Sequence, residues 1–186
     1  MAGTTSAIQM ASNALVLIGH PPISSFDEPG AGARAASNLY ESSYTNLLTL
    51  TRWRFAAKKV QLSRFAASPL NQYTYQFQLP DDLLYLINTL NGEDYEIYED
   101  RLFANHMDIS IDYIFRVDES RLPAYFIKAF QFSFASELAI PVTANSTRAT
   151  EYERKYKEQV AQAFYLDASQ RPSDEKLTSE YIDVRN

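Results

Sequence analysis

The stretch Gln72-Tyr73-Thr74-Tyr75-Gln76-Phe77-Gln78-Leu79 decides the fold class of this chain. Polar and apolar side chains alternate along it, which is the period-two pattern of a β-strand with one face in a core and the other in water. Pro80 ends the pattern, because proline cannot donate a hydrogen bond to a strand ladder. A strand is therefore predicted in the middle of the chain.

Further short strands are predicted downstream, at residues 83–90, 95–98, 102–104 and 109–117. Asn91-Gly92 lies between the first two of these, and both residues tolerate positive φ, so a tight turn is expected to join the two strands as a hairpin. The region from about residue 55 to about residue 117 is therefore expected to form a small antiparallel β-module.

Helical patterns precede the β-module. Apolar residues recur three and four positions apart over residues 4–18 and again over residues 31–51. Ser6 is expected to cap the first helix, and the run Gly19-His20-Pro21-Pro22 ends it, because glycine accepts a left-handed cap and proline breaks the hydrogen-bond ladder.

Helical patterns also follow the β-module. Pro123 is expected to be the first residue of a helix that runs to Ala139 and stops at Pro141. Asn145 or Ser146 is expected to cap a last helix, which has an apolar stripe and a strongly charged opposite face. After residue 168 the sequence turns polar, with too few apolar residues to form a core of its own.

The fold class predicted from these patterns is α+β, mainly α. A four-helix bundle-like domain is built from residues 1–54 and 118–168, and the antiparallel β-module at 55–117 is inserted into it. An extended C-terminal tail covers residues 169–186.

The composition of the chain argues against several classes of site and partner. Hydrophobic residues make up 46% of the chain and charged residues 22%, which is typical of one soluble globular domain. Cysteine is absent, which excludes disulfides, thiolate metal sites and cysteine nucleophiles. The apolar run 14–18 is too short for a membrane span, and no basic segment precedes it as in a signal peptide, so neither a signal peptide nor a membrane partner is expected. The net charge of −6 argues against tight binding to the phosphates of duplex DNA.

Three motifs have residue types that occur in catalytic or binding sites. Gly30-Ala31-Gly32-Ala33-Arg34-Ala35 fits the dinucleotide-binding fingerprint, but no buried strand precedes it, so a helix entry is the better interpretation. His20 and His106 fall in different modules without metal-ligand spacing. Asp81-Asp82 and the group Asp94, Glu96, Glu99 and Asp100 would suit a glycoside hydrolase only if two carboxyl groups lay about 5–10 Å apart, and surface solvation is favoured. No catalytic residue, metal or cofactor is predicted.

The segment Arg52-Trp53-Arg54-Phe55, followed by Lys58, Lys59 and Arg64, combines cations with aromatic rings. Such a pattern can bind single-stranded nucleic acid by stacking and charge. The favoured interpretation is that Trp53 and Phe55 anchor the junction between helix and sheet while the cations face solvent or an acidic neighbouring subunit.

Several short segments occur in an order that resembles the podovirus tail tubular protein A group and related portal-bound head-to-tail adaptors. The segments are 14–25 (ALVLIGHPPISS), 53–56 (WRFA), 78–83 (QLPDDL), 112–114 (DYI) and 138–143 (LAIPVT). Each is a helix cap, a core anchor or a strand end, so the resemblance rests on their order and spacing, which extends over most of residues 8–168.

This resemblance implies a structural, non-enzymatic protein of the virion, assembled in the host cytoplasm. It implies a ring of about twelve copies, closed by heterologous contacts, that docks beneath the portal protein and leads to the tail nozzle protein. Double-stranded DNA would pass through the ring without tight binding. Residues expected to contact the portal or a neighbouring subunit are Arg52 and Trp53 at the junction, and Leu177, Tyr181 and Ile182 in the tail.

Two other classes stay open on the sequence alone. One is a tail-associated hydrolase acting on cell-surface carbohydrate, for which Asp81 or Asp82 would be required. The other is a single-strand nucleic-acid-binding module that uses Arg52 and Arg54.

Overall fold

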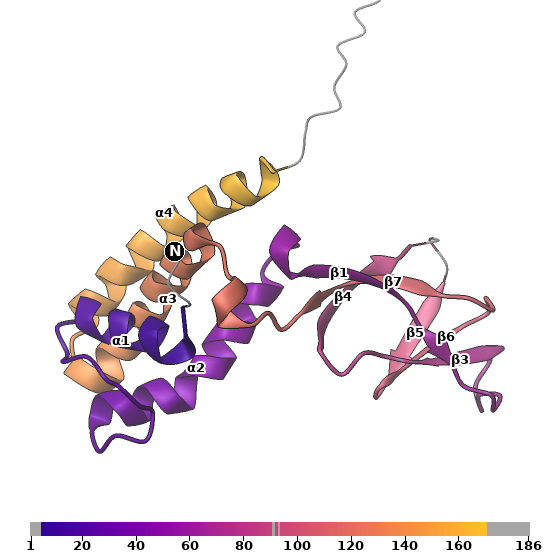
Figure 1. Cartoon of the computed structure of the whole chain (residues 1–186), viewed down its shortest axis with the longest axis horizontal. Coiled ribbons are helices and arrows are strands. Elements are labelled where there is room, and N and C mark those ends of the chain that lie inside the picture. Colours follow the sequence, from indigo (N-terminus) through magenta and orange to yellow (C-terminus); the bar gives the residue numbers. More distant parts are fainter. Residues whose placement is uncertain (1–4, 91, 93, 171–186) are drawn as a thin grey trace, which may run out of the picture.

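A computed structural model describes residues 5–90, 92 and 94–170 (Figure 1). This part of the chain contains four α-helices and two antiparallel β-sheets, so the α+β class with an excess of helix is confirmed. The helices are α1 (Ala7–Leu17), α2 (Ala31–Thr49), α3 (Ala124–Thr143) and α4 (Ser146–Ala168).

Local sequence signals explain the ends of α1 and the start of α4. Ser6 caps α1 as predicted, and its Oγ accepts a hydrogen bond from the amide of Gln9 at 3.2 Å. Gly19 then adopts φ +81°, in the left-handed region that glycine enters without steric cost. Asn145 caps α4 in the same way as Ser6, accepting from the amide of Arg148 at 3.0 Å.

The expected end of α3 at Pro141 is wrong, because the helix continues to Thr143. Pro141 lies in the last turn, where the missing amide removes a single backbone hydrogen bond. Val142 still packs on the helical core, and the Thr143 hydroxyl donates to the Ala139 carbonyl at 2.6 Å. Ala144, with φ +50°, ends the helix instead. Pro123 is the N-cap residue of α3 and lies just outside the helix.

Helix α3 is the centre of the helical part and packs against α1, α2 and α4. Its buried side meets α2 through a cluster of aromatic rings whose centroids lie 5.3–6.1 Å apart, mostly edge to face. The members of this cluster are Tyr40, Tyr44, Phe126, Phe130 and Phe134. The Tyr44 hydroxyl donates to the carbonyl of Val117 at 2.9 Å, which ties α2 to the chain that returns from the sheets.

The strands form two sheets. One has the order β1-β7-β4, with β1 (Ala57–Gln61), β7 (Ser110–Phe115) and β4 (Leu83–Thr89). The other has the order β2-β3-β6-β5, with β2 (Ser63–Arg64), β3 (Tyr75–Gln78), β6 (Arg101–Ala104) and β5 (Tyr95–Tyr98). All neighbours in both sheets are antiparallel.

The hairpin expected at Asn91-Gly92 is wrong. The two strands that flank it in sequence, β4 and β5, belong to different sheets and do not pair. The hairpin of this region instead joins β5 to β6, with Tyr98 opposite Arg101 and a turn at Glu99-Asp100. Glu99 adopts φ +55° there, although neither turn residue is a glycine or asparagine.

The sheet β1-β7-β4 lies between two hydrophobic cores. Ala57, Leu84 and Ile114 pack with the helices, whereas Ile111 and Tyr113 pack with the second sheet. Strand β1 leaves the helices and β7 returns beside it, with Ala57 opposite Ile114 (Figure 1). The strands therefore extend from one side of the helical layer as a second lobe.

Candidate interaction surfaces

Trp53 follows α2 and is completely buried. Its indole Nε1 donates to the Leu47 carbonyl at 2.9 Å, and its ring meets Phe126 edge to face at 5.2 Å between centroids. The prediction that Trp53 contacts a partner is therefore wrong, because a side chain without exposed surface cannot touch another protein. Its role as the anchor of the junction between helix and sheet is confirmed.

Arg52 is exposed over 54% of its side chain and pairs with Asp112 of β7. The Asp112 side chain is only 2% exposed, and its Oδ1 atom has no hydrogen-bond partner among the described residues. A buried carboxylate costs several kcal/mol unless a positive charge compensates it. Arg52 therefore neutralises Asp112 and still reaches the surface.

A pocket of about 510 Å³ opens beside this ion pair and is lined by Arg52, Arg54, Ala57 and Lys59. Lys59 lies opposite Asp112 in the register of β1 and β7. Within the described chain, the side chains of Arg54 and Lys59 form no ion pair. We call this the basic pocket; it gathers three cations and one compensating carboxylate on a chain whose net charge is −6.

Asp167 holds the end of α4 against the basic pocket. Its Oδ2 atom accepts from the backbone amide of Arg54 at 2.9 Å, and its Oδ1 atom accepts from the Tyr125 hydroxyl at 2.7 Å. Burial, together with the bond to this carboxylate and its charge, raises the pKa of Tyr125. The sequence analysis missed Asp167, although a carboxylate that continues the apolar stripe of Ala163 and Phe164 is a signal of a buried polar contact.

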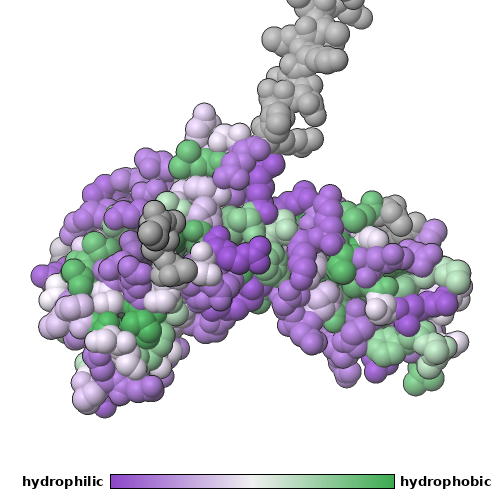
Figure 2. Space-filling model, in the orientation of Figure 1, coloured by the Kyte–Doolittle hydropathy of each residue, from purple (hydrophilic) through white to green (hydrophobic). Residues whose placement is uncertain are grey.

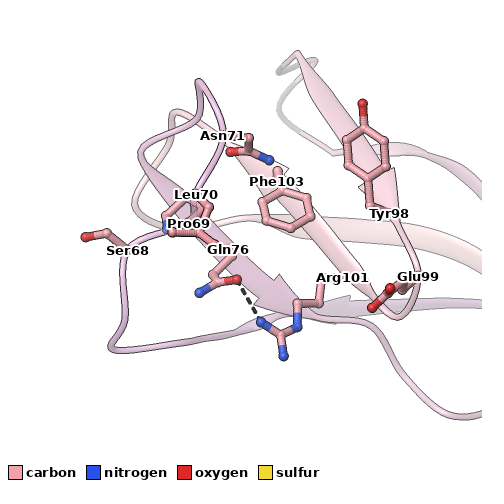
Figure 3. A pocket seen from close by; sticks show the side chains of 9 residues that line it. All are labelled: Ser68, Pro69, Leu70, Asn71, Gln76, Tyr98, Glu99, Arg101 and Phe103. Atoms are coloured by element: carbon pink, nitrogen blue, oxygen red, sulfur yellow. Dashed lines mark hydrogen bonds between the residues drawn. The ribbon is translucent and has the colours of Figure 1, made fainter.

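A second pocket, of about 520 Å³, lies on the outer face of the sheet β2-β3-β6-β5. Figure 3 shows Tyr98 and Phe103 on neighbouring strands, with Leu70 on the loop beside them and Arg101 donating to Gln76 at 3.0 Å. Gln76 was expected on a wet face, but it is buried because its amide also donates to the Ala67 carbonyl of the covering loop. This pocket mixes apolar and polar side chains without a dominant charge.

The surface has small hydrophobic patches on both lobes and no single large one in the view of Figure 2. One patch lies at the end of α4, where Tyr165 is 74% exposed and Leu166 is 45% exposed beside a shallow pocket of about 460 Å³. The described chain ends four residues after Leu166, at Gln170. The predicted tail contacts Leu177, Tyr181 and Ile182 lie outside the described residues.

Two of the carboxylates considered for hydrolysis, Asp82 and Asp100, have other contacts. Asp82 accepts from Lys58 Nζ at 3.0 Å and from the Tyr113 hydroxyl at 2.9 Å. Partial burial acts to raise the pKa of Asp82, but the bonds from Lys58 and Tyr113 outweigh it and lower that pKa. Asp100 lies in the hairpin turn and accepts from Gln78 at 3.2 Å. The described residues contain no group of three His, Cys, Asp or Glu side chains arranged for a metal ion.

The glycine motif at residues 30–35 has a packing role. A Cβ atom on Gly32 would lie 2.4 Å from the imidazole Cε1 of His20, so the glycine makes room for that ring. His20 in turn lies 2.8 Å from the Pro21 carbonyl through its Nδ1 atom. Gly30 is the N-cap residue of α2, and no strand precedes it, which agrees with the helix-entry interpretation.

Comparisons with known proteins add no relative: no model of a known protein family matches the chain, and no curated protein matches it either. Among the described helices, none combines the length and the apolar composition that crossing a membrane requires.

Proposed function

We propose that this chain is a structural subunit of the head-to-tail connector of a tailed phage. About twelve copies would form a ring beneath the portal protein, and the tail nozzle protein would attach below it. In this proposal the helices form a bundle-like ring domain that makes the wall and the portal contact, and the β-module points toward the tail. The protein acts by binding its neighbours and catalyses no reaction.

The observation that carries the proposal is the division of the chain into two differently built lobes with separate surfaces. The end of α4 exposes Tyr165 and Leu166 on the helical lobe. On the other lobe, the sheet β2-β3-β6-β5 carries a pocket of its own. A connector subunit must contact a different protein at each end and identical copies at its sides, which requires several distinct surfaces on one chain.

The segments that carry the sequence resemblance give further support through their contacts. In the segment after α1, the Ile23 amide donates to Ser12 Oγ at 3.1 Å and holds the loop on the helix. Trp53 fixes the junction, and Asp82 binds Lys58 and Tyr113 where β4 begins. Such contacts would preserve the relative position of the two lobes in any protein that shared these segments.

The charge of the chain suits a conduit for DNA. A ring of about twelve copies would carry about −72 charges, and an acidic channel repels phosphates, which lets DNA slide without adhesion. A channel surface made mostly of Lys and Arg would contradict this part of the proposal.

The two rival classes receive less support. A single-strand binding module needs exposed aromatic rings for stacking, and Trp53 is buried. A carbohydrate hydrolase needs two carboxyl groups at a cleft, and Asp82 is engaged with Lys58 and Tyr113 on the surface of the β-module.

The direct test is to mix the purified full chain with portal rings from the same phage and to image the product by electron microscopy. We expect a second ring attached to one end of the portal. A chain that stays monomeric at micromolar concentration with the portal, and is absent from the neck of the mature virion, would exclude the proposed function.

A further inference from the structure

The cations of the basic pocket need a partner that the described chain does not supply. Arg52 is compensated by Asp112, whereas Arg54 and Lys59 have no ion pair. The pocket is partly enclosed, so charges inside it are screened less than charges on an open surface. It therefore fits a group with at least two negative charges.

The same chain carries a group of exposed or half-exposed carboxylates on β5 and in the turn that follows it. We call the β5–β6 pair and its turn the acidic hairpin, after Asp94, Glu96, Glu99 and Asp100. Asp94 and Glu99 are exposed without an ion pair among the described residues, and Asp100 has only a long one, 3.7 Å to Arg101. Most other described carboxylates are engaged in ion pairs or hydrogen bonds, for example those of Asp82, Glu119, Glu151 and Asp167.

We propose that the basic pocket of one copy binds the acidic hairpin of the next copy, and this inference rests on the ring proposed above. Two different surfaces that fit each other make a heterologous contact, which is the kind that closes a ring by rotation. Among the described residues, the hairpin of the same chain forms no ion pair with the cations of the pocket.

The sheet order leaves both surfaces accessible. Strand β5 is the edge of the sheet β2-β3-β6-β5, and β1, which carries Lys59, is the edge of the sheet β1-β7-β4. No strand of the described chain covers either edge. Charges at such edges also prevent indiscriminate pairing of sheets, so that association depends on the matching of opposite charges.

A carboxylate partner is favoured over nucleic acid. The net charge of −6 repels a long phosphate backbone along its whole length, whereas the hairpin carries its four carboxylates within residues 94–100, with Glu99 and Asp100 in the turn. Binding of the full chain to a fluorescent oligonucleotide as tightly as to itself, with loss of that binding in the pocket variant below, would overturn the proposal in favour of a nucleic-acid site.

The test is a charge exchange in the full chain. The pocket variant carries Arg54→Glu and Lys59→Glu, and the hairpin variant carries Glu96→Lys and Glu99→Lys. Each variant alone should associate at least about tenfold more weakly than wild type in sedimentation velocity, because like charges then face each other. An equal mixture of the two should associate again, since each variant then offers the partner that the other lacks.

A chain with all four substitutions is a further check, because its reversed pocket and reversed hairpin match again. It should associate within about threefold of wild type, and wild-type association should weaken at least about tenfold between low and high salt. Rescue in the mixture also shows that both variants fold, and circular dichroism of each variant alone checks this independently.

The outcomes separate this inference from the proposed function. If the wild type forms rings and both variants do so equally well, the charge contact is wrong while the ring stands. If the variants fold but the mixture does not recover association, the contact is also wrong. If the wild type forms no ring, either alone or on the portal, the proposed function fails and this inference fails with it.

Discussion

Arg52 and Arg54 are two residues apart, yet they have different tasks. Arg52 compensates the buried carboxylate of Asp112, and Arg54 has no ion pair within the described chain. We expect Arg52→Ala to lower the free energy of unfolding by about 1–3 kcal/mol, because it leaves a buried charge without compensation. Arg54→Ala, the matched control, should change it by less than about 0.5 kcal/mol. Urea denaturation measures both, and equal effects would contradict the assignment.

Asp82 provides a prediction on pH. Its pKa is lower in the folded chain than in the unfolded chain, so its contribution to stability is complete above the unfolded value of 3.8 and is lost as the pH falls through the folded value. We expect Asp82→Asn to reduce the acid dependence of the free energy of unfolding between about pH 5 and about pH 2. Denaturation at several pH values measures this, and Asp81→Asn serves as the control on an exposed neighbour. If Asp82→Asn left the acid dependence of the free energy of unfolding unchanged, the network with Lys58 and Tyr113 would be excluded.

The elements were predictable where one local signal decides them. Ser6 and Asn145 cap their helices by contacts within three residues, and strand β5 has the predicted bounds. Elements whose partners are remote in sequence were not predictable. Strand β1 has the sequence Ala-Lys-Lys-Val-Gln, which shows little alternation, and it forms because β7, which is remote in sequence, lies beside it and pairs with it from Ala57–Ile114 to Gln61–Ser110. The Asn91-Gly92 signal is local, but the sheet order overrides the pairing it predicts.

Two left-handed residues allow a comparison between a turn with a proposed task and a turn without one. Glu99 has φ +55° in the β5–β6 turn, and Ala144 has φ +50° after α3. Replacement of either by glycine should raise the free energy of unfolding by about 0.5–1 kcal/mol, because glycine has no Cβ atom to strain this conformation. Only Glu99→Gly removes a charge of the acidic hairpin.

We therefore expect Glu99→Gly to associate more weakly than wild type although its melting temperature is higher, whereas Ala144→Gly should gain stability without losing association. Thermal denaturation and sedimentation velocity on the same samples measure the two quantities. Equal association of the two variants would mean that the Glu99 charge has no part in assembly.

For the whole molecule, the sequence predicted the class of the fold better than it predicted the candidate surfaces. Arg52 was selected as a contact residue from its charge, and the geometry leaves it exposed. Trp53 was selected for the same role and lies in the core, because a large ring beside a helix end is worth more buried than exposed. Asp167 and Lys59 come together with this segment only through α4 and β1, and no short-range pattern contains that information.

The predicted C-terminal tail is expected to take part in assembly of the whole ring. Under the proposed function, Leu177, Tyr181 and Ile182 anchor the C-terminal segment on the portal or on a neighbouring subunit, because a few apolar side chains usually dominate such docking. Deletion of residues 169–186 should leave a folded monomer that assembles poorly on portal rings. Circular dichroism and sedimentation measure folding and assembly separately, and a truncated chain that assembles normally would refute the role of the tail. The full chain with the three substitutions Leu177→Ala, Tyr181→Ala and Ile182→Ala is the variant to compare with the deletion, and it should assemble poorly as well.

The side-by-side course of β1 and β7 has a mechanical consequence. A force that draws the two lobes apart acts on both strands in the same direction, so it does not make one slide past the other. Their five residue pairs, from Ala57 with Ile114 to Gln61 with Ser110, are then spared from shear, and the load falls on the anchorage of Trp53 and Tyr44 in the helical core. When the two lobes are pulled apart, the molecule should therefore yield first in that anchorage, while the ladder between β1 and β7 is still intact.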